Sequence, residues 1–222
     1  MIHACIFDAF GTLFNLDQTL VNDIQHKSVD KILIYAREKQ LAYTWVKSLM
    51  EDYINFEEIT KIALEDACLK YDAPTKLIKD LSNIYFKPIV FDDVKSILAS
   101  LQKLNIKTGI LSNGTHAMLN SGIEINDFKN DIDVIYSADD IQTFKPHPSV
   151  YQMVCDGENC EAKHILFISS NQWDIAGANK FGFQTAWLNR SQSFRESIIR
   201  SEQVTELKTA TEIYALLNQN LR

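Results

Sequence analysis

Glycine, proline and cysteine are scarce in this chain of 222 residues, which contains seven, four and four of them. Four scattered cysteines are too few for a disulfide framework at this length. Cys155 and Cys160 have a C-x4-C spacing but no second cysteine or histidine pair near them, which argues against a zinc site. A chain this long can bury a sizeable core without such cross-links, so we expect free thiols in a reducing compartment.

The chain also lacks an excess of positive charge, a long apolar run and a secretory signal. It has 22 Lys and Arg against 29 Asp and Glu, and a formal net charge of −7, which argues against a nucleic-acid partner. No apolar run approaches the ~18 residues of a membrane span. Residues 1–8 lack the basic-then-apolar order of a signal peptide and instead resemble a buried strand. These features predict a soluble, cytoplasmic protein without a membrane partner.

Glycine is absent from residues 12–108, and this stretch has helical periodicity. Apolar side chains, with one arginine among them, recur there at steps of three and four, at Ile34, Arg37, Leu41, Trp45 and Leu49 and then at Phe56, Ile59, Ala63 and Ala67. We therefore predict an all-helical cap domain at residues 15–94. It is inserted into a core domain made of residues 1–14 and 95–222.

Outside the insert, short apolar runs alternate with helical segments. The predicted strands are Ile2–Phe7, Lys107–Leu111, Asp133–Tyr136, His164–Ile168 and Gln184–Leu188. The predicted helices lie near Val94–Leu104, Thr115–Asn120, Pro148–Asp156 and Trp173–Phe181, and Thr209-x-x-Glu212 is a candidate capping box for a last helix through Leu217. This alternation predicts βαβ units, and hence an α/β fold with a doubly wound parallel sheet covered by helices on both faces.

Polar residues follow four of the five predicted strands. Asp8 follows the first strand, residues 112–114 end the second, Lys145 comes after the third, and the fourth runs into residues 169–174. Ligands of open parallel sheets bind beyond the carboxyl ends of the strands. A single Asp at such an end is more often a turn residue than a nucleophile. Four polar ends in one crevice instead favour an active site.

The polar ends belong to four longer segments, Asp8-Ala9-Phe10-Gly11-Thr12-Leu13-Phe14, Leu111-Ser112-Asn113-Gly114, Lys145-Pro146 and Ser169-Ser170-Asn171-x-Trp173-Asp174. In this order they resemble the four motifs of the haloacid dehalogenase superfamily. Within it the chain is similar to the L-2-haloacid dehalogenases, and the similarity includes Arg37-Glu38-Lys39-Gln40-Leu41-x-Tyr43-x-Trp45 in the insert. The resemblance implies a Rossmann-like core with an inserted cap, no cofactor, and a homodimer that binds a small 2-haloacid and releases halide.

Two positions favour carbon–halogen cleavage over phosphoryl transfer. The superfamily's phosphatases resemble one another in carrying a second Asp two residues after the nucleophile, where this chain has Phe10. A departing alkoxide gains ~10²–10⁴-fold from a positioned acid, whereas a halide needs no proton. Phosphatases also commonly place two carboxylates in the fourth motif to help hold Mg²⁺, where Ser170 and Asp174 leave only one. We therefore predict metal-independent hydrolysis of short (S)-2-haloalkanoic acids to (R)-2-hydroxyalkanoic acids, with inversion at C2.

The resemblance implies a two-step mechanism through an ester on Asp8. Asp8 would attack C2 of the substrate and expel halide, with Lys145 holding its carboxylate ionised and in position. Asp174 would then orient or deprotonate the water that hydrolyses the ester, assisted by Asn171 and Lys145.

An anion pocket must offset the charge of nucleophile, substrate and halide. By analogy with the family, Arg37, Asn113 and the edge of Trp173 would cradle the departing halide. Ser112 would bind the substrate carboxylate together with backbone N–H groups of the turn after Asp8, at Ala9 and Phe10. The remaining predicted partners support these groups by hydrogen bonds and are Thr12, Tyr151 and Ser169.

Three alternatives stay open at this point. Arg37 can form a structural ion pair or extend its charge into solvent, rather than complete the pocket. The protein can be a Mg²⁺-dependent phosphatase of the same superfamily, although no acid replaces the one missing at Phe10. It can also be a non-catalytic binding protein with this fold.

Overall fold

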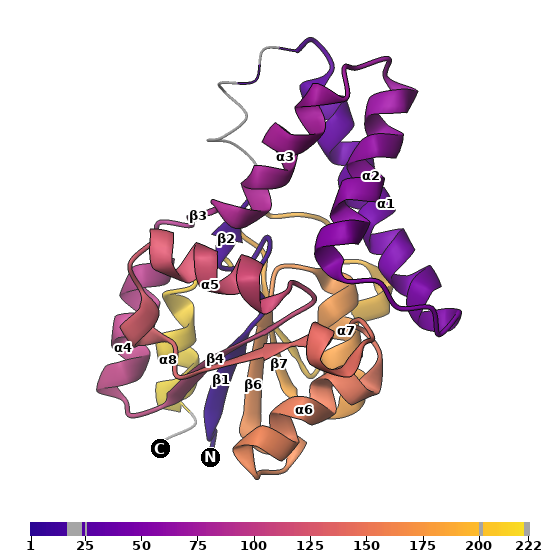
Figure 1. The fold of residues 1–222 in the computed structure, drawn as a ribbon. Coiled ribbons are helices and arrows are strands. Elements are labelled where there is room, and N and C mark those ends of the chain that lie inside the picture. The colour runs from indigo at the N-terminus through magenta and orange to yellow at the C-terminus, as the bar shows by residue number, and fades with distance from the viewer. Residues whose placement is uncertain (17–23, 25, 200–201, 220–222) are drawn as a thin grey trace.

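A six-stranded sheet forms the centre of the molecule in a computed structural model that describes residues 1–222 except 17–23, 25, 200–201 and 220–222 (Figure 1). The strand order is β5-β4-β1-β6-β7-β8, and every neighbouring pair is parallel. The strands are β1 (Ala4–Phe7), β4 (Lys107–Ser112), β5 (Val134–Ser137), β6 (Ile165–Ser169), β7 (Gln184–Leu188) and β8 (Val204–Leu207). The predicted α/β fold class is confirmed.

Helices cover both faces of this sheet (Figure 1). Those packed on one face are α4 (Val94–Lys103), α5 (His116–Ile125) and α8 (Glu212–Gln219), and those on the other are α6 (Pro148–Glu158) and α7 (Gln172–Phe181). Alternate residues of β1 enter the two resulting cores: Cys5 and Phe7 one, Ala4 and Ile6 the other. A central strand buried on both faces must be apolar throughout, which explains its clear sequence signal. Short 3₁₀ helices in the described chain are η1 (Lys129–Asp131), η2 (Ala138–Ile141), η3 (Ala162–His164) and η4 (Ser197–Ile199).

The C-terminal part of the core differs from the sequence-based expectation in two places. Strand β8 was not predicted, because at this edge of the sheet only its terminal residues Val204 and Leu207 are buried and the polar pair between them interrupts the apolar run. The capping box was wrong, since the Thr209 hydroxyl pairs with that of Thr211 and the Glu212 carboxylate accepts the Lys208 N–H at 3.0 Å. Helix α8 therefore begins at Glu212 without the reciprocal pair.

Helix α5 also continues further than predicted, to Ile125 instead of Asn120. It runs through Gly122, a residue that usually weakens a helix interior. A Cβ at Gly122 would lie 2.6 Å from the ring of Phe14, so the glycine allows this ring to approach the helix backbone. Phe14 follows the Asp8 turn, and its packing anchors that turn to the core.

Three helices stand together beyond the carboxyl ends of the strands, and we call them the cap (Figure 1). They are α1 (Val29–Leu49), α2 (Phe56–Lys70) and α3 (Lys76–Phe86). The chain leaves the core through β2 (Phe14–Asn15) and returns through β3 (Ile89–Val90), and these two-residue strands pair antiparallel. The predicted boundary at 14/15 falls within β2, and the one at 94/95 lies four residues after the end of β3. The pairing of these strands places the two connections side by side.

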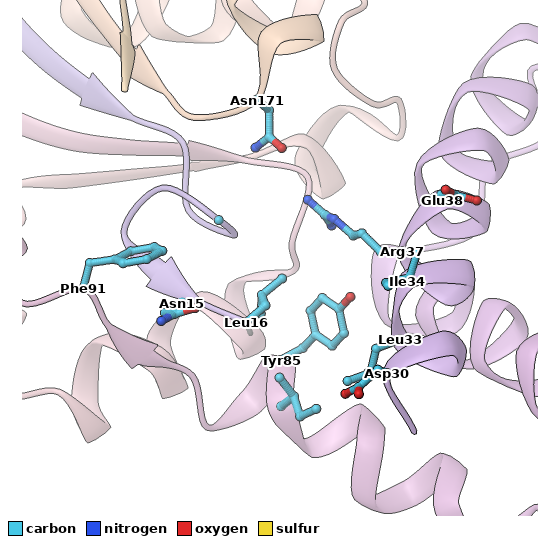
Figure 2. Close-up of a pocket in the computed structure, with 12 residues that line it drawn as sticks. Asn15, Leu16, Asp30, Leu33, Ile34, Arg37, Glu38, Tyr85, Phe91 and Asn171 are labelled. Carbon is cyan, nitrogen blue, oxygen red and sulfur yellow. The ribbon is translucent and has the colours of Figure 1, made fainter. Parts of the chain in front are cut away.

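The periodic residues predicted on α1, which we call the stripe, are not the buried face of this helix. They are Ile34, Arg37, Leu41, Trp45 and Leu49. Ile34 and Leu49 are 63% and 85% exposed, while the buried side chains follow steps of four at Ile32, Ala36, Gln40 and Thr44. Two of these four are polar and hydrogen-bonded, so hydrophobicity alone does not identify this face. Four members of the stripe, Ile34, Arg37, Leu41 and Trp45, instead line the space between cap and core. Arg37 points towards the core loops (Figure 2).

Candidate active site

The carboxyl ends of the central strands bring the polar motifs together. Asp8 directly follows β1, Ser112 ends β4 and Ser169 ends β6, the strands that flank β1. Lys145 lies in the loop before α6, and Asp174 in the first turn of α7. Parallel strands place all their carboxyl ends at one edge, so residues far apart in sequence meet above the sheet.

A buried ion cluster lies at the centre of this edge. The Lys145 ammonium donates to Asp8 Oδ1 at 2.7 Å, to Asp174 Oδ2 at 2.5 Å and to the Leu111 carbonyl at 3.0 Å. The side chains of Lys145, Asp8 and Asp174 are only 1%, 7% and 0% exposed. The Lys145 ammonium is thus the shared counter-ion of two buried carboxylates, so removing this cation would destabilise the folded protein.

The electrostatic environment shifts the pKa values of this cluster. Burial raises the pKa of Asp174 to about 6, against the opposing charge of Lys145 and with a further rise from Asp8. Burial alone would lower the pKa of Lys145, but Asp174 and Asp8 outweigh it and the net shift is upward. Burial also raises the pKa of Tyr151 well above its usual range, so its hydroxyl stays a donor to Asp174 Oδ1 at 2.8 Å. The pKa of Asp174 is therefore raised although a cation lies beside it.

The second oxygen of Asp8 is surrounded by hydrogen-bond donors. Oδ2 accepts from the Thr12 hydroxyl at 2.9 Å, from Asn171 Nδ2 at 2.8 Å and from the Ser169 hydroxyl at 3.4 Å. The carboxylate is thus oriented by Lys145 on one oxygen and by these three side chains on the other. Such donors also favour negative charge on Oδ2 during a reaction at this carboxyl group.

A tight turn after Asp8 returns Thr12 to the carboxylate. The Ala9 carbonyl accepts the backbone N–H groups of Thr12, Leu13 and Phe14 at 3.1, 2.9 and 2.9 Å. Gly11 has a φ of +90°, in the left-handed region where a side chain would be strained. Its N–H donates to the Phe14 carbonyl at 2.8 Å and closes the turn.

Buried polar side chains tie the other loops to the same place. The Asn113 carbonyl oxygen accepts the backbone N–H of Lys145 at 2.8 Å, and the Ser112 hydroxyl accepts that of Gly114 at 3.1 Å. The Ser169 hydroxyl accepts the backbone N–H of Asn171 at 3.0 Å. These bonds fix the loops after β4 and β6 and the loop that carries Lys145.

The cap closes over Asp8 and leaves a cavity of about 10 Å³. Its lining combines polar motif residues with apolar side chains of core and cap: Asp8, Phe10, Arg37, Leu41, Phe56, Ser112, Asn113, Lys145, Asn171 and Trp173. A space of this size holds about one water molecule. Within the described residues, the indole N–H groups of Trp45 and Trp173 are buried without a hydrogen-bond partner, and the two rings meet edge to face.

Two open clefts of about 560 and 600 Å³ lie outside this cavity, between cap and core. Both are lined by Gly11, Arg37, Phe91 and Asn171, and of these Arg37 and Asn171 also line the cavity. Figure 2 shows the first cleft, with Arg37 reaching from the cap towards Asn171 of the core. Arg37 therefore lines the small cavity and both clefts.

The structure places twelve of the thirteen predicted site residues in two groups. Eight of them line the cavity: Asp8, Phe10, Arg37, Ser112, Asn113, Lys145, Asn171 and Trp173. Four others lie behind it and hydrogen-bond to the Asp8–Lys145–Asp174 cluster or belong to it: Thr12, Tyr151, Ser169 and Asp174. Ala9 does not line the cavity and contributes its carbonyl to the turn.

Leu41 and Phe56 line the cavity but were not among the predicted site residues. Leu41 follows Arg37 by four positions on α1, so the stripe that contains both was a usable signal. Phe56 gave no such signal, because its place in the wall depends on how α2 packs against Phe10 of the core.

Arg37 does not form the structural ion pair that the sequence left open. Among the residues that the structure describes, it has no salt bridge to a carboxylate, and its Nη1 donates to the neutral Gln40 Oε1 at 2.6 Å. The described part of the chain also contains no group of three His, Cys, Asp or Glu side chains able to hold a metal ion. In the same residues, no helix is both long and apolar enough to pass through a bilayer.

Comparison with known proteins identifies a matching family model and similar sequences. Residues 5–188 match the family model of haloacid dehalogenase-like hydrolases. The chain is 34% identical over 193 residues to (S)-2-haloacid dehalogenase 4A of Burkholderia cepacia, covering 85% of this chain and 84% of the relative. It is 32% identical over 219 residues to the (S)-2-haloacid dehalogenase of Pseudomonas sp. (strain YL), covering 96% and 94%.

A solved structure matches almost the whole fold. The L-2-haloacid dehalogenase from Xanthobacter autotrophicus with chloropropionic acid covalently bound superimposes with a TM-score of 0.89 and 26% identity, covering 98% of this chain and 99% of the other. Family model, relatives and fold all agree. The chain therefore belongs to the (S)-2-haloacid dehalogenase family of haloacid dehalogenase-like hydrolases.

Proposed function

We propose that this protein hydrolyses the carbon–halogen bond of short (S)-2-haloalkanoic acids to give (R)-2-hydroxyalkanoic acids and halide ions. The observation that carries the proposal is the buried Asp8 carboxylate, held by Lys145 in a cavity with no other carboxyl group in its lining. This arrangement supplies a nucleophile but no proton for the leaving group, as expulsion of a weakly basic halide requires.

In the first step, an Asp8 oxygen attacks C2 of the substrate from the side opposite the halogen. A carbon–oxygen ester bond forms while the carbon–halogen bond breaks, and its electron pair leaves with the halide. Displacement from behind inverts C2. The covalently bound chloropropionic acid in the Xanthobacter autotrophicus enzyme supports such an intermediate.

The charges of this step need local compensation. Two like charges ~4 Å apart repel by about 4 kcal/mol at an effective dielectric of ~20, and both nucleophile and substrate are carboxylates. Lys145 and Arg37 supply two cations at the cavity wall. Asn113 and the unpartnered indole N–H of Trp173 add donors there, which we assign to the departing halide.

In the second step, water attacks the carboxyl carbon of the Asp8 ester. Asp174 accepts the proton of this water, and its pKa of about 6 suits a base that works near neutral pH. The donors Thr12, Asn171 and Ser169 hold the negative charge that develops on Asp8 Oδ2. Collapse of the intermediate releases the hydroxy acid, whose oxygen takes the proton back from Asp174. The second proton of the water, left on the Asp8 carboxyl group, passes to solvent and restores the carboxylate.

Metal independence is part of the proposal. Mg²⁺ is usually bound by one or two carboxylates together with the substrate's phosphates. Here Asp8 and Asp174 already share the Lys145 ammonium, and Ser170 stands where a phosphatase of this fold commonly carries a further carboxylate.

Substrate entry requires the cap to move away from the core. A cavity of about 10 Å³ accommodates roughly one water molecule and no haloacid. The cap is joined to the core by the short β2–β3 ladder, and the two clefts share Arg37 and Asn171 with the cavity. Opening along these clefts admits the substrate, and closure then brings Arg37 back to Asp8.

We further propose that the protein is a cytoplasmic homodimer. The four cysteines are all free thiols, as a reducing compartment allows. Exposed apolar side chains gather at the end of α1, where Val46, Leu49 and Met50 are 49%, 85% and 60% exposed. Such side chains suit burial against a second copy.

One assay distinguishes this function from the Mg²⁺-dependent phosphatase and the non-catalytic binder. The purified protein is incubated with (S)-2-chloropropionate and with p-nitrophenyl phosphate, each with and without EDTA. We expect chloride release that EDTA does not reduce, and no phosphate release. Phosphate release that EDTA abolishes would support the phosphatase, and inactivity towards both compounds would support the binder.

A further inference from the structure

Arg37 is the only described cation that the cap contributes to the cavity wall, and its guanidinium is held by a buried amide. Its Nη1 donates to Gln40 Oε1 at 2.6 Å, and Gln40 is only 1% exposed. Gln40 lies three residues further along α1, on the buried face of the helix. The contact therefore joins an active-site charge to the interior of the cap.

The orientation of the Gln40 amide is fixed by its other partners. The Thr60 hydroxyl of α2 donates to the Phe56 carbonyl at 2.6 Å, so its oxygen is left to accept from Gln40 Nε2 at 2.5 Å. Gln40 Oε1 must then face Arg37. The Tyr85 hydroxyl of α3 donates to the same oxygen at 3.2 Å, and burial raises the pKa of Tyr85 above its ordinary value despite the nearby charge of Arg37.

Gln40, the hydrogen-bond partner of Arg37, is neutral, so it does not cancel the positive charge of the guanidinium. A carboxylate at the same place would accept the same hydrogen bond but cancel the positive charge. Gln40 instead fixes the guanidinium and leaves its charge available to an anion in the cavity. A buried amide in an otherwise apolar interface is costly unless its hydrogen bonds are satisfied, and here both ends of the amide are satisfied.

We infer that Gln40 is a positioning residue for dehalogenation: it holds Arg37 against the departing halide without neutralising it. Thr60 and Tyr85 keep the Gln40 amide in the required orientation. The inference rests on the proposed function, because it assigns Gln40 to the halide-releasing step of that reaction. Gln40 acts through Arg37 and does not line the cavity itself.

The test compares two variants of equal size. Gln40→Glu keeps the shape and the acceptor for Arg37 but adds a negative charge, and Gln40→Met removes the acceptor; both also lose the Nε2 donor to Thr60. The control is Thr44→Val, which removes a buried hydroxyl one turn further along α1 that bonds only to the Leu41 carbonyl in its own helix. Chloride release and ester formation on Asp8 are followed after rapid mixing with (S)-2-chloropropionate, and decay of the ester is followed separately.

We expect both Gln40 variants to slow chloride release by about 10- to 100-fold, less than the ~10²–10³-fold loss typical for a donor that touches the developing charge. Ester decay should stay within about twofold of wild type, because Arg37 acts on the leaving halide and not on the water. Added bromide should inhibit Gln40→Glu more weakly than wild type, since the halide site has lost its net charge. Thr44→Val should match wild type in both steps.

The melting temperature separates this role from a structural one. Gln40→Glu should stay folded, because its ion pair with Arg37 offsets the loss of the bond from Nε2 to Thr60, and yet release chloride slowly. Wild-type rates of chloride release and unchanged bromide inhibition in a folded Gln40→Glu protein would overturn the inference and leave the proposed function intact. Absence of chloride release from wild type would instead contradict the proposed function.

Discussion

The contact of Lys145 with two buried carboxylates makes its replacement the most informative single change. Lys145→Met keeps most of the side-chain volume and removes the charge. Asp8 and Asp174 place oxygens 2.7 and 2.5 Å from the same Nζ atom, so without the ammonium they face each other at a distance where like charges repel by about 4 kcal/mol at an effective dielectric of ~20. Removing one partner of a buried ion pair costs about 3–5 kcal/mol. We expect the free energy of unfolding to fall by this amount near pH 8.

The loss should depend on pH in a direction that the pKa of Asp174 determines. Burial already raises this pKa to about 6, against the opposing charge of Lys145, and removal of Lys145 raises it further. If the pKa of a carboxyl group is higher in the folded than in the unfolded chain, the free energy of unfolding rises as the pH falls. The deficit of Lys145→Met should therefore be largest near pH 8 and shrink towards about pH 5.

Urea unfolding of wild type and Lys145→Met at these two pH values measures the effect, with circular dichroism as the probe. The double variant Lys145→Met, Asp174→Asn is the control, because it removes one of the two uncompensated charges and should recover part of the lost stability at the higher pH. A Lys145→Met protein as stable as wild type, or a loss that is equal at both pH values, would refute this view of the ion cluster.

Three further predictions concern turnover, hydrolysis of the ester, and the contacts of Arg190 near the connections between cap and core. Arg37→Ala should abolish turnover and leave the melting temperature within a few degrees of wild type; gross unfolding would indicate a structural role. The rate of ester hydrolysis should fall at acid pH as Asp174 takes up a proton and cannot accept one from water, at a pH below the value of about 6 because the esterified Asp8 no longer adds its charge; a flat profile down to about pH 4 would exclude it as the base. Arg190→Met should lower the free energy of unfolding by about 1–3 kcal/mol in urea titrations, because Arg190 bonds to both Asp93 oxygens and to the Thr12 carbonyl; an unchanged midpoint would contradict this.

The core and its strand-end motifs could be read from the sequence because each depends on local pattern. Strand β1 is buried on both faces, so its apolar run is continuous, and Asp8 follows it directly. Parallel topology then brings Asp8 close to residues more than a hundred positions away, such as Lys145. Strand β8 lies at the sheet edge and has a polar pair in its middle, so it gave no such run.

The cap side of the site could not be predicted in the same way. The role of Gln40 depends on Thr60 and Tyr85, which approach it from two other helices. The periodicity of α1 also suggested the wrong buried face, because most apolar residues of the stripe line the clefts, while two of the four buried side chains of α1 are polar and hydrogen-bonded. Side chains whose place depends on how helices pack on each other and on the core leave little trace in a single sequence.

The measurement that tests the central claim most directly is a single turnover in water enriched in heavy oxygen, with enzyme in excess over (S)-2-chloropropionate. After the reaction, mass spectrometry of proteolytic peptides locates the label. Hydrolysis of an ester on Asp8 predicts one heavy oxygen in the peptide that contains Asp8 and an unlabelled hydroxy acid. Heavy oxygen in the hydroxy acid and none in that peptide would mean that water attacks C2 directly, and would contradict Asp8 as the nucleophile.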